Sequence, residues 1–184
     1  MHDLTPTSAL GGISDTIGTI TITENTGVAL ASVTARIGGE PKTRQVLKAL
    51  LGDVPGPGRS QQHDPEAGFW MGPDQWMIGA PMATHELLAS QLKSLTGDAA
   101  SVTEQSGAWV VFDVIGTAMP DMMERLCAAP IRMMKAGDAQ RRVIHHLACF
   151  IIQRNDPGHI RILGPRASAG SLHHALVGAA RSVA

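Results

Sequence analysis

The chain has 184 residues, a formal net charge of −1 and a pI near 6.7. This length fits one domain or two fused halves, and it is sufficient to bury a substantial core. Lys and Arg form no cluster larger than a pair, so the sequence offers no electrostatic case for binding nucleic acid or an anionic membrane.

The N-terminus has neither a basic region nor a sustained apolar run, and we expect no secretory signal. No apolar run approaches the roughly 18 residues that span a bilayer. We therefore expect a cytoplasmic protein with no membrane partner. Cys127 and Cys149 lie far apart and show no metal-binding spacing, so we expect two reduced, semi-buried thiols.

Residues 1–17 are polar and have no hydrophobic period, which predicts an N-terminal arm without a fold of its own, ordered only against a partner. The remainder, 18–184, is expected to be a single α+β domain made of two halves, about 28–105 and 109–184. A short edge strand around Ile20 and Ile22 precedes them.

The first half begins with a strand from Val28 to Ile37, and Pro41 then opens a helix. Residues 52–67 are rich in Pro and Gly and predict a long loop. Pro81 introduces a second helix with four leucines at helical spacing, and Ala100–Glu104 is the closing strand. The leucines are Leu87, Leu88, Leu92 and Leu95.

The segment 68–78 holds two of the three tryptophans, Trp70 and Trp76. They flank Gly72-Pro73-Asp74, whose Gly and Pro supply turn conformations, so the segment predicts a tight hairpin. Asp74 is its one ionisable group, and an Asp in a turn more often bonds its own backbone than takes part in catalysis. We expect Trp76 to be a core residue.

The second half predicts a similar order of elements. They are a strand over Trp109–Val114, a helix over Ala118–Cys127, an irregular stretch over 128–141, a strand over Val143–Ile152, a turn over Asn155–Gly158, a strand over His159–Leu163 and a helix over Ser168–Arg181.

An internal repeat relates the halves. The Pro73 hairpin with its following helix matches the Pro157 hairpin with its helix, and Ile37-Gly38 matches Ile115-Gly116 between a strand and a helix. Two pseudo-repeated βαββα-type halves predict an α+β fold with mixed or antiparallel sheets covered by helices.

Candidate metal ligands are the pairs His145-His146 and His173-His174. Neighbours on a strand face opposite ways and neighbours on a helix diverge by about 100°, so neither pair can chelate one ion. Surface or partner contact is the better interpretation.

Other candidates for chemistry lack a complete motif. Asp64, Glu66 and Asp74 could bracket a cleft, but nothing in the sequence brings them together. Ser106-Gly107 has Glu104 where a nucleophile elbow needs its first Gly.

No glycine run fits a phosphate loop, and five arginines around the C-terminal hairpin could grip an anion or form ordinary ion pairs. The glycines are Gly38, Gly39 and Gly137, and the arginines are Arg141, Arg142, Arg154, Arg161 and Arg166. We assign no catalytic, cofactor-binding or metal-binding residue to this chain.

Ordered motifs along the chain resemble the γ subunit of bacterial heterotetrameric sarcosine oxidase. The most specific is Trp70-Met71-Gly72-Pro73-Asp74-Gln75-Trp76. The others are Leu4-Thr5-Pro6, Gly11-Gly12, Val28–Val33, Pro55-Gly56-Pro57, Val102–Ser106 and Pro165–Ser168. In one departure, the run Arg141–His146 lacks the Thr expected between its basic and His positions.

The resemblance implies a non-catalytic subunit whose fold resembles the folate-binding domain of the glycine-cleavage T-protein family. Its partners would be α, β and δ subunits, which would carry the complex's FAD, FMN, NAD and zinc. That complex oxidises sarcosine with tetrahydrofolate and oxygen to glycine, 5,10-methylenetetrahydrofolate and hydrogen peroxide.

The alternative is an independent folate-binding, aminomethyltransferase-like protein. Glu104 would then be the acidic residue on the pterin, and Trp70 or Trp76 would be stacking walls. A third class is an unrelated scaffold or chaperone domain.

Overall fold

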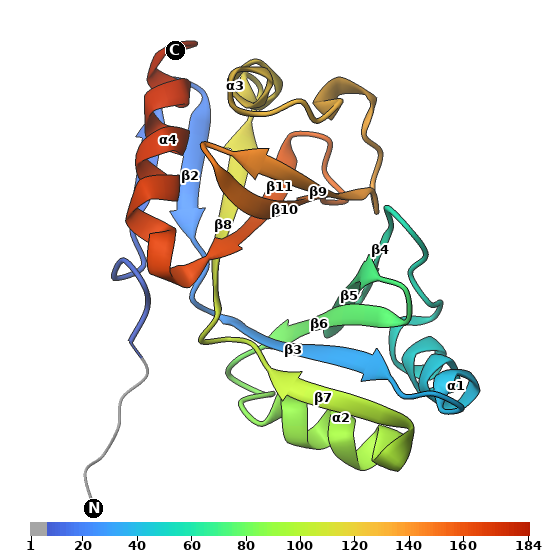
Figure 1. The fold of residues 1–184 in the computed structure, drawn as a ribbon. Coiled ribbons are helices and arrows are strands. Elements are labelled where there is room, and N and C mark those ends of the chain that lie inside the picture. Colours follow the sequence, from blue (N-terminus) through green and yellow to red (C-terminus); the bar gives the residue numbers. More distant parts are fainter. Residues whose placement is uncertain (1–6) are drawn as a thin grey trace, which may run out of the picture. The chain divides into compact units, whose positions relative to one another are not determined.

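A computed structural model describes residues 7–184 of the chain. It divides into two compact units. Unit 1 comprises Met1–Thr26, Ala108–Met134 and Arg141–Ala184, and unit 2 comprises Gly27–Gly107 and Lys135–Gln140. Each unit pairs an antiparallel sheet with two α-helices, and each is described by itself (Figure 1).

Unit 2 is built on sheet B, with strand order β4-β5-β6-β3-β7. The strands are β3 (Val28–Ala35), β4 (Ser60–His63), β5 (Glu66–Gly72), β6 (Gln75–Pro81) and β7 (Ala100–Glu104). Helices α1 (Glu40–Leu51) and α2 (Leu88–Thr96) pack on one face, and the short 3₁₀ helix η1 (Gly97–Ala99) leads into β7. Alternate strand residues such as Val33, Trp76 and Ile78 form the core with Leu47 and Leu92 from the helices.

Unit 1 is built on sheet A, with order β1-β2-β8-β11-β10-β9. The strands are β1 (Ser14–Ile17), β2 (Ile20–Glu24), β8 (Trp109–Gly116), β9 (Ala139–Ile144), β10 (Leu147–Gln153) and β11 (His159–Pro165). The helices are α3 (Met119–Leu126), α4 (Ala169–Arg181) and the 3₁₀ helices η2 (Ile131–Met133) and η3 (Arg166–Ser168).

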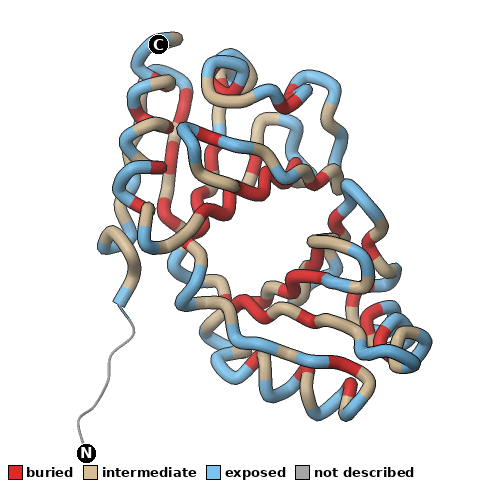
Figure 2. The backbone as a smooth tube through the Cα atoms, viewed as in Figure 1, coloured by how far each residue is buried: buried red, intermediate tan, exposed pale blue. Residues whose placement is uncertain are grey.

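The core of unit 1 lies between sheet A and the helices α3 and α4. Phe112 and Val114 of β8 face it, as do Met122 of α3 and Leu172 of α4, and all four are fully buried. Figure 2 shows buried stretches along the strands and shorter buried segments on the helices. The predicted α+β fold of two repeated, sheet-and-helix halves is confirmed.

The repeat is visible in the strand orders, because β4-β5-β6-β3-β7 corresponds to β9-β10-β11-β8-β2. In unit 2 the strand beside β3 is β7, which follows α2. In unit 1 the equivalent place beside β8 is taken by β2, which comes from the beginning of the chain.

Glycines mark the same point in both units. A Cβ on Gly39 would stand 2.2 Å from the carbonyl oxygen of Ala99, just before β7. A Cβ on Gly116 would stand 2.0 Å from the carbonyl oxygen of Thr19, just before β2. In each unit the chain leaving the central strand therefore passes the start of the neighbouring strand at a distance that a side chain forbids.

The N-terminal segment differs from our expectation. Residues 14–17, predicted to lack a fold, form β1 on the edge of sheet A, where the hydroxyls of Ser14 and Thr16 bond those of Thr23 and Thr21. The buried carboxylate of Glu24 accepts backbone N–H bonds from Ala9, Leu10 and Gly12. These hydrogen bonds and the packing of Ala9, Leu10 and Ile17 on the core hold this segment. Residues 1–6 of the predicted arm lie outside the described residues.

Three further predictions were wrong in detail. The strand predicted over Val143–Ile152 is two strands joined by a turn at His145 and His146, whose φ angles are 45° and 70°. The irregular stretch 128–141 already contains the start of β9, and the loop 52–67 contains β4. β4 has the sequence Ser-Gln-Gln-His, whose polar side chains give no apolar alternation.

The helix predicted after Pro81 begins later, at Leu88, because Pro81 ends β6. Leu88 and Leu92 are buried as expected, whereas Leu87 and Leu95 are exposed. No helix within residues 7–184 is long and apolar enough to cross a membrane.

Candidate functional site

A polar cluster on sheet A is the most strongly organised ionic group of the described chain. Asp113 lies in the middle of β8, with Phe112 and Val114 turned to the core, so its own side chain points to the opposite sheet face. Arg161 of β11 is its direct cross-strand partner, and Asn25 follows β2 on the other side of β8. We call Asp113, Arg161, His159 and Asn25 the Asp113 cluster.

Every member of the cluster bonds the same carboxylate. Arg161 donates from Nε to Oδ1 of Asp113 at 2.9 Å and from Nη2 to Oδ2 at 2.8 Å. Asn25 donates from Nδ2 to Oδ2 at 2.7 Å. The Nε2 atom of His159 lies 2.9 Å from Oδ1. The side chains of Asp113, Arg161 and His159 retain 13%, 17% and 21% of their exposure, so the cluster is largely but not fully desolvated.

These contacts set the ionisation of Asp113. Burial alone would raise the pKa of its carboxyl group, but the hydrogen bonds from His159 and Arg161, the Arg161 charge and the Asn25 bond outweigh burial and hold the pKa well below its ordinary value. Asp113 is therefore an anion at all physiological pH values, and it fixes the orientation of Arg161 and His159.

The same sheet face carries other features. Ile115 stands directly opposite His159 and Thr21 in register and is 45% exposed. Further along the face the rings of Trp109 and Phe150 lie 5.5 Å apart. We call the side of sheet A opposite α3 and α4, which carries Asp113, Ile115, His159, Arg161, Trp109 and the buried Phe150, the outer face of sheet A.

Sequence reasoning found only part of this cluster. Arg161 belonged to the predicted arginine set, but Asp113, His159 and Asn25 were not singled out. A usable signal was present, since Asp113 is the one charged residue within the otherwise apolar strand Trp109–Ile115. An isolated charge in such a strand requires a partner.

The five arginines do not share one anion. Arg161 is paired with Asp113, Arg141 stands over the ring of Phe150 at 5.5 Å, and Arg166 donates to the carbonyl oxygen of Thr7. Arg142 donates to the neighbouring backbone carbonyl of Arg141.

Neither histidine pair is arranged as a pair of metal ligands. His145 and His146 form the β9–β10 turn, so our placement of them on a strand was wrong. His173 of α4 stacks on Phe112 and bonds Asp15 through Nε2 at 2.8 Å, while His174 is exposed. Among residues 7–184 no group of three His, Cys, Asp or Glu side chains could hold a metal ion.

The three candidate carboxylates also lie apart. Glu66 begins β5 and pairs with His85 at 3.5 Å, whereas Asp74 lies in the turn beyond the other end of β5. Asp74 bonds the Arg44 guanidinium at 2.7 Å rather than its own backbone. Asp64 is exposed in the β4–β5 turn.

Ser106 and Glu104 secure the end of β7. The hydroxyl of Ser106 accepts the backbone N–H of Leu30, and Oε1 of Glu104 accepts the backbone N–H of Ser106. Neither arrangement supplies a base to activate a nucleophile.

Trp76 is in the core of unit 2, as predicted. It is 1% exposed, donates from Nε1 to the carbonyl oxygen of Pro55 at 2.9 Å and carries Arg44 over its ring. Trp70, its cross-strand partner in the hairpin, packs partly buried against the same core.

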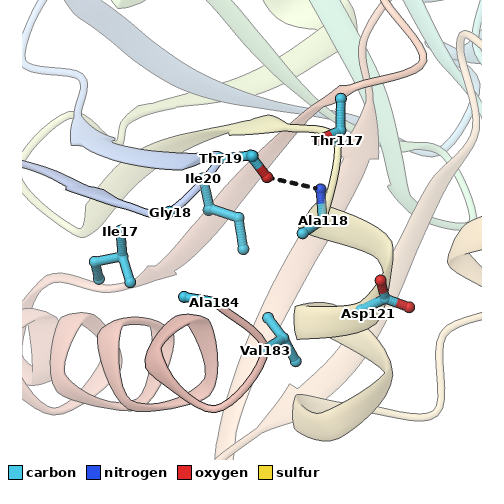
Figure 3. Close-up of a pocket in the computed structure, with 9 residues that line it drawn as sticks. All are labelled: Ile17, Gly18, Thr19, Ile20, Thr117, Ala118, Asp121, Val183 and Ala184. Carbon is cyan, nitrogen blue, oxygen red and sulfur yellow. Dashed lines mark hydrogen bonds between the residues drawn. The ribbon is translucent and has the colours of Figure 1, made fainter.

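A surface pocket of about 390 Å³ opens between the β1–β2 turn and the start of α3 in unit 1. Figure 3 shows its lining, in which the hydroxyl of Thr19 accepts the backbone N–H of Ala118 at 3.3 Å. Ile17, Ile20 and Val183 form the apolar part of its lining, and its one charged side chain, Asp121, pairs with Arg132 outside. The pocket holds no arrangement suited to catalysis.

The cysteines are free, as the sequence suggested. Burial raises the pKa of the Cys149 thiol to about 11 and also raises the pKa of Cys127. Both thiols are therefore protonated at neutral pH and are poor nucleophiles.

Comparison with solved structures places this fold among known ones. The chain is similar to a chain of the heterotetrameric sarcosine oxidase from Corynebacterium sp. U-96, with a TM-score of 0.78 and 20% identity over 89% of this chain and 85% of that one. It is also similar to the glycine cleavage system aminomethyltransferase T from Bartonella henselae, with a TM-score of 0.63 and 14% identity over 86% of this chain.

That second match spans 45% of the aminomethyltransferase, so this chain corresponds to less than half of it. The sequence matches no family model and no curated protein. At these identities the two structures establish a shared fold.

Proposed function

We propose that this chain is the non-catalytic γ subunit of a heterotetrameric sarcosine oxidase, where it supports assembly of the flavin-containing subunits. The match with the Corynebacterium oxidase carries this proposal. It covers nearly equal shares of both chains, 89% and 85%, so the two chains are of similar length. The ordered motifs around the Trp70–Trp76 hairpin support the same assignment.

The side chains of the described residues agree with an architectural role. Trp76 of the most distinctive motif is buried in the core, and Ser106 and Glu104 bond the backbone. The α, β and δ subunits would be its partners and would carry FAD, FMN, NAD and zinc. The working reaction would be oxidative demethylation of sarcosine, with tetrahydrofolate and oxygen, in the cytoplasm.

The test is to express the α, β and δ subunits with and without this chain. We expect a lower yield of flavin-containing complex without it, and normal sarcosine turnover per mole of bound flavin in whatever complex does form. If Glu104→Gln or Arg142→Ala reduced turnover a hundredfold while assembly and flavin content stayed normal, the chain would contribute catalytic groups and the proposal would be wrong.

An alternative function is folate binding by the chain alone. The similarity of its fold to that of an aminomethyltransferase suggests this alternative. Titration of the purified chain with tetrahydrofolate separates the two functions. Saturable binding that Glu104→Gln abolishes would favour the alternative, because Glu104 is the acidic residue that the alternative assigns to the pterin.

A further inference from the structure

Only one of the two hydrogen-bonding edges of the Arg161 guanidinium group is occupied. An arginine presents two edges that each match a carboxylate, one formed by Nε with Nη2 and one by Nη1 with Nη2. Asp113 occupies the first edge with bonds of 2.9 and 2.8 Å. Within residues 7–184 no hydrogen-bond acceptor takes Nη1, so the second edge is available to a ligand.

Asp113 also holds the second edge in a defined orientation. Its two bonds fix the plane of the guanidinium, and the bond from Asn25 anchors the carboxylate in turn. The entropy lost when a ligand binds is consequently smaller than for a free surface arginine. The Arg161 side chain is 17% exposed, so its polar atoms are only partly screened by water.

His159 adds a second group beside Arg161. Its Nε2 atom bonds Asp113, and no residue of the described chain bonds its Nδ1 atom. With His159 protonated, His159, Arg161 and Asp113 together carry a net charge of +1, which one bound carboxylate neutralises. Ile115, across the ladder from His159 and 45% exposed, offers apolar contact for the carbon atoms next to that carboxylate.

We propose that Arg161 and His159 form a binding site for a carboxylate that carries a short apolar group, on the outer face of sheet A. The carboxylate bonds the Nη1–Nη2 edge of Arg161 and the Nδ1–H of His159, and its hydrocarbon part lies on Ile115. This site is independent of the proposed assembly role. The carboxylate comes either from a small metabolite or from a Glu side chain of a protein partner.

The test uses the full chain near pH 6, with its histidine rings labelled with ¹⁵N. Three probes are titrated: butyrate, a blocked Ala-Glu-Ala peptide and, as the uncharged match, butyramide. We expect a saturable shift of the His159 ring signals with at least one of the two carboxylates and none with butyramide. The His173 and His174 signals are internal references that should not move.

Variants locate the site. Arg161→Lys keeps the charge and a bond to Asp113 but removes the second edge, so carboxylate affinity should fall about tenfold or more, as expected for loss of a charge-assisted bidentate contact. His159→Gln, whose affinity is measured by calorimetric titration of the same carboxylates because the variant has no His159 signal, should weaken binding while preserving a donor to Asp113. Arg132→Lys, which changes an exposed, ion-paired arginine, should have no effect.

A higher affinity for butyrate identifies a metabolite site, and a higher affinity for the Glu peptide identifies a protein partner. Absence of a saturable His159 shift with both carboxylates would overturn the proposal, as would equal shifts with butyramide. If Arg161→Lys does not fold, His159→Gln decides: unchanged affinity in that variant would also overturn it.

Discussion

Asp113 shows how one residue can join three strands. Its carboxylate receives bonds from β11 and from the residue after β2, and its low pKa reflects those bonds. We expect Asp113→Asn to lower the free energy of unfolding at pH 7 by about 3 kcal/mol, because it leaves the Arg161 charge partly buried without its partner. Urea unfolding at pH 7 measures this change.

The control and the pH dependence sharpen this prediction. Asp98→Asn, which removes a fully exposed carboxylate 3.9 Å from Lys93, should change stability by less than about 0.5 kcal/mol. Because folding lowers the pKa of Asp113, its stabilisation is complete above the ordinary value of 3.8 and is lost as the pH falls below it. The difference between wild type and Asp113→Asn should therefore shrink in acid, and a difference that grew there would contradict our account.

Trp76 is expected to contribute to stability rather than to recognition. Trp76→Ala should lower the free energy of unfolding by roughly 3–5 kcal/mol, because it empties a fully buried site. Trp76→Phe should cost less, since it retains most of the packing and removes mainly the bond to Pro55. Denaturant titration of both variants tests whether Trp76→Ala loses more stability than Trp76→Phe. An unchanged melting temperature of Trp76→Ala, combined with lost partner binding, would instead assign Trp76 a role in function.

At the scale of elements, replacing the closely packed glycine of either unit by alanine should destabilise the protein to a similar extent. Gly39→Ala and Gly116→Ala each place a methyl group against a backbone carbonyl oxygen, so each should lower the free energy of unfolding by about 1–3 kcal/mol. Gly116 also has a φ angle of 152°, which adds strain. Thermal unfolding of both variants gives the measurement.

Gly178→Ala is the matched control for these two changes. Gly178 lies inside α4 and a Cβ there meets no atom within 4 Å. Alanine should stabilise the helix by about 0.5–1 kcal/mol. If Gly39→Ala and Gly116→Ala were as harmless as Gly178→Ala, the strand and the turn beside each glycine would not be in tight contact.

Sequence patterns predicted the elements whose side chains alternate or recur regularly. The helices α3 and α4 were found because apolar residues recur at helical spacing, β8 because it is a short apolar run, and the Trp70–Trp76 hairpin because Gly72 and Pro73 mark its turn. β1 and β4 were missed because they are polar strands held by backbone pairing. The turn at His145 and His146 was missed because it contains no Gly, Pro, Asn or Asp, the residues that most often mark a turn in a sequence.

The candidate site was less predictable for a physical reason. Asp113, His159 and Asn25 are distant in sequence, and it is the strand order β2-β8-β11 that brings them together. Strand order depends on long-range pairing, which no local periodicity encodes. The only signal of this site in the sequence was the single charged residue, Asp113, within an apolar strand.

For the whole molecule, we expect the chain purified alone to carry no flavin, NAD or zinc. The sequence contains no dinucleotide-binding fingerprint and no zinc-ligand spacing. Visible absorption and elemental analysis of the purified chain measure this, and a stoichiometric flavin spectrum or metal content would contradict it. The same purification from the co-expressed complex supplies the positive control.

The origin of β2 also bears on how the protein is made. Sheet B takes its strands from one continuous stretch, β3 to β7, so it can fold as soon as that stretch has left the ribosome. Sheet A needs β1 and β2, which precede that stretch in the chain, together with β8 and β11, which follow it. The nascent β1–β2 segment must therefore remain unpaired with β8 while about eighty intervening residues are translated, so one edge of β2 stays exposed during synthesis.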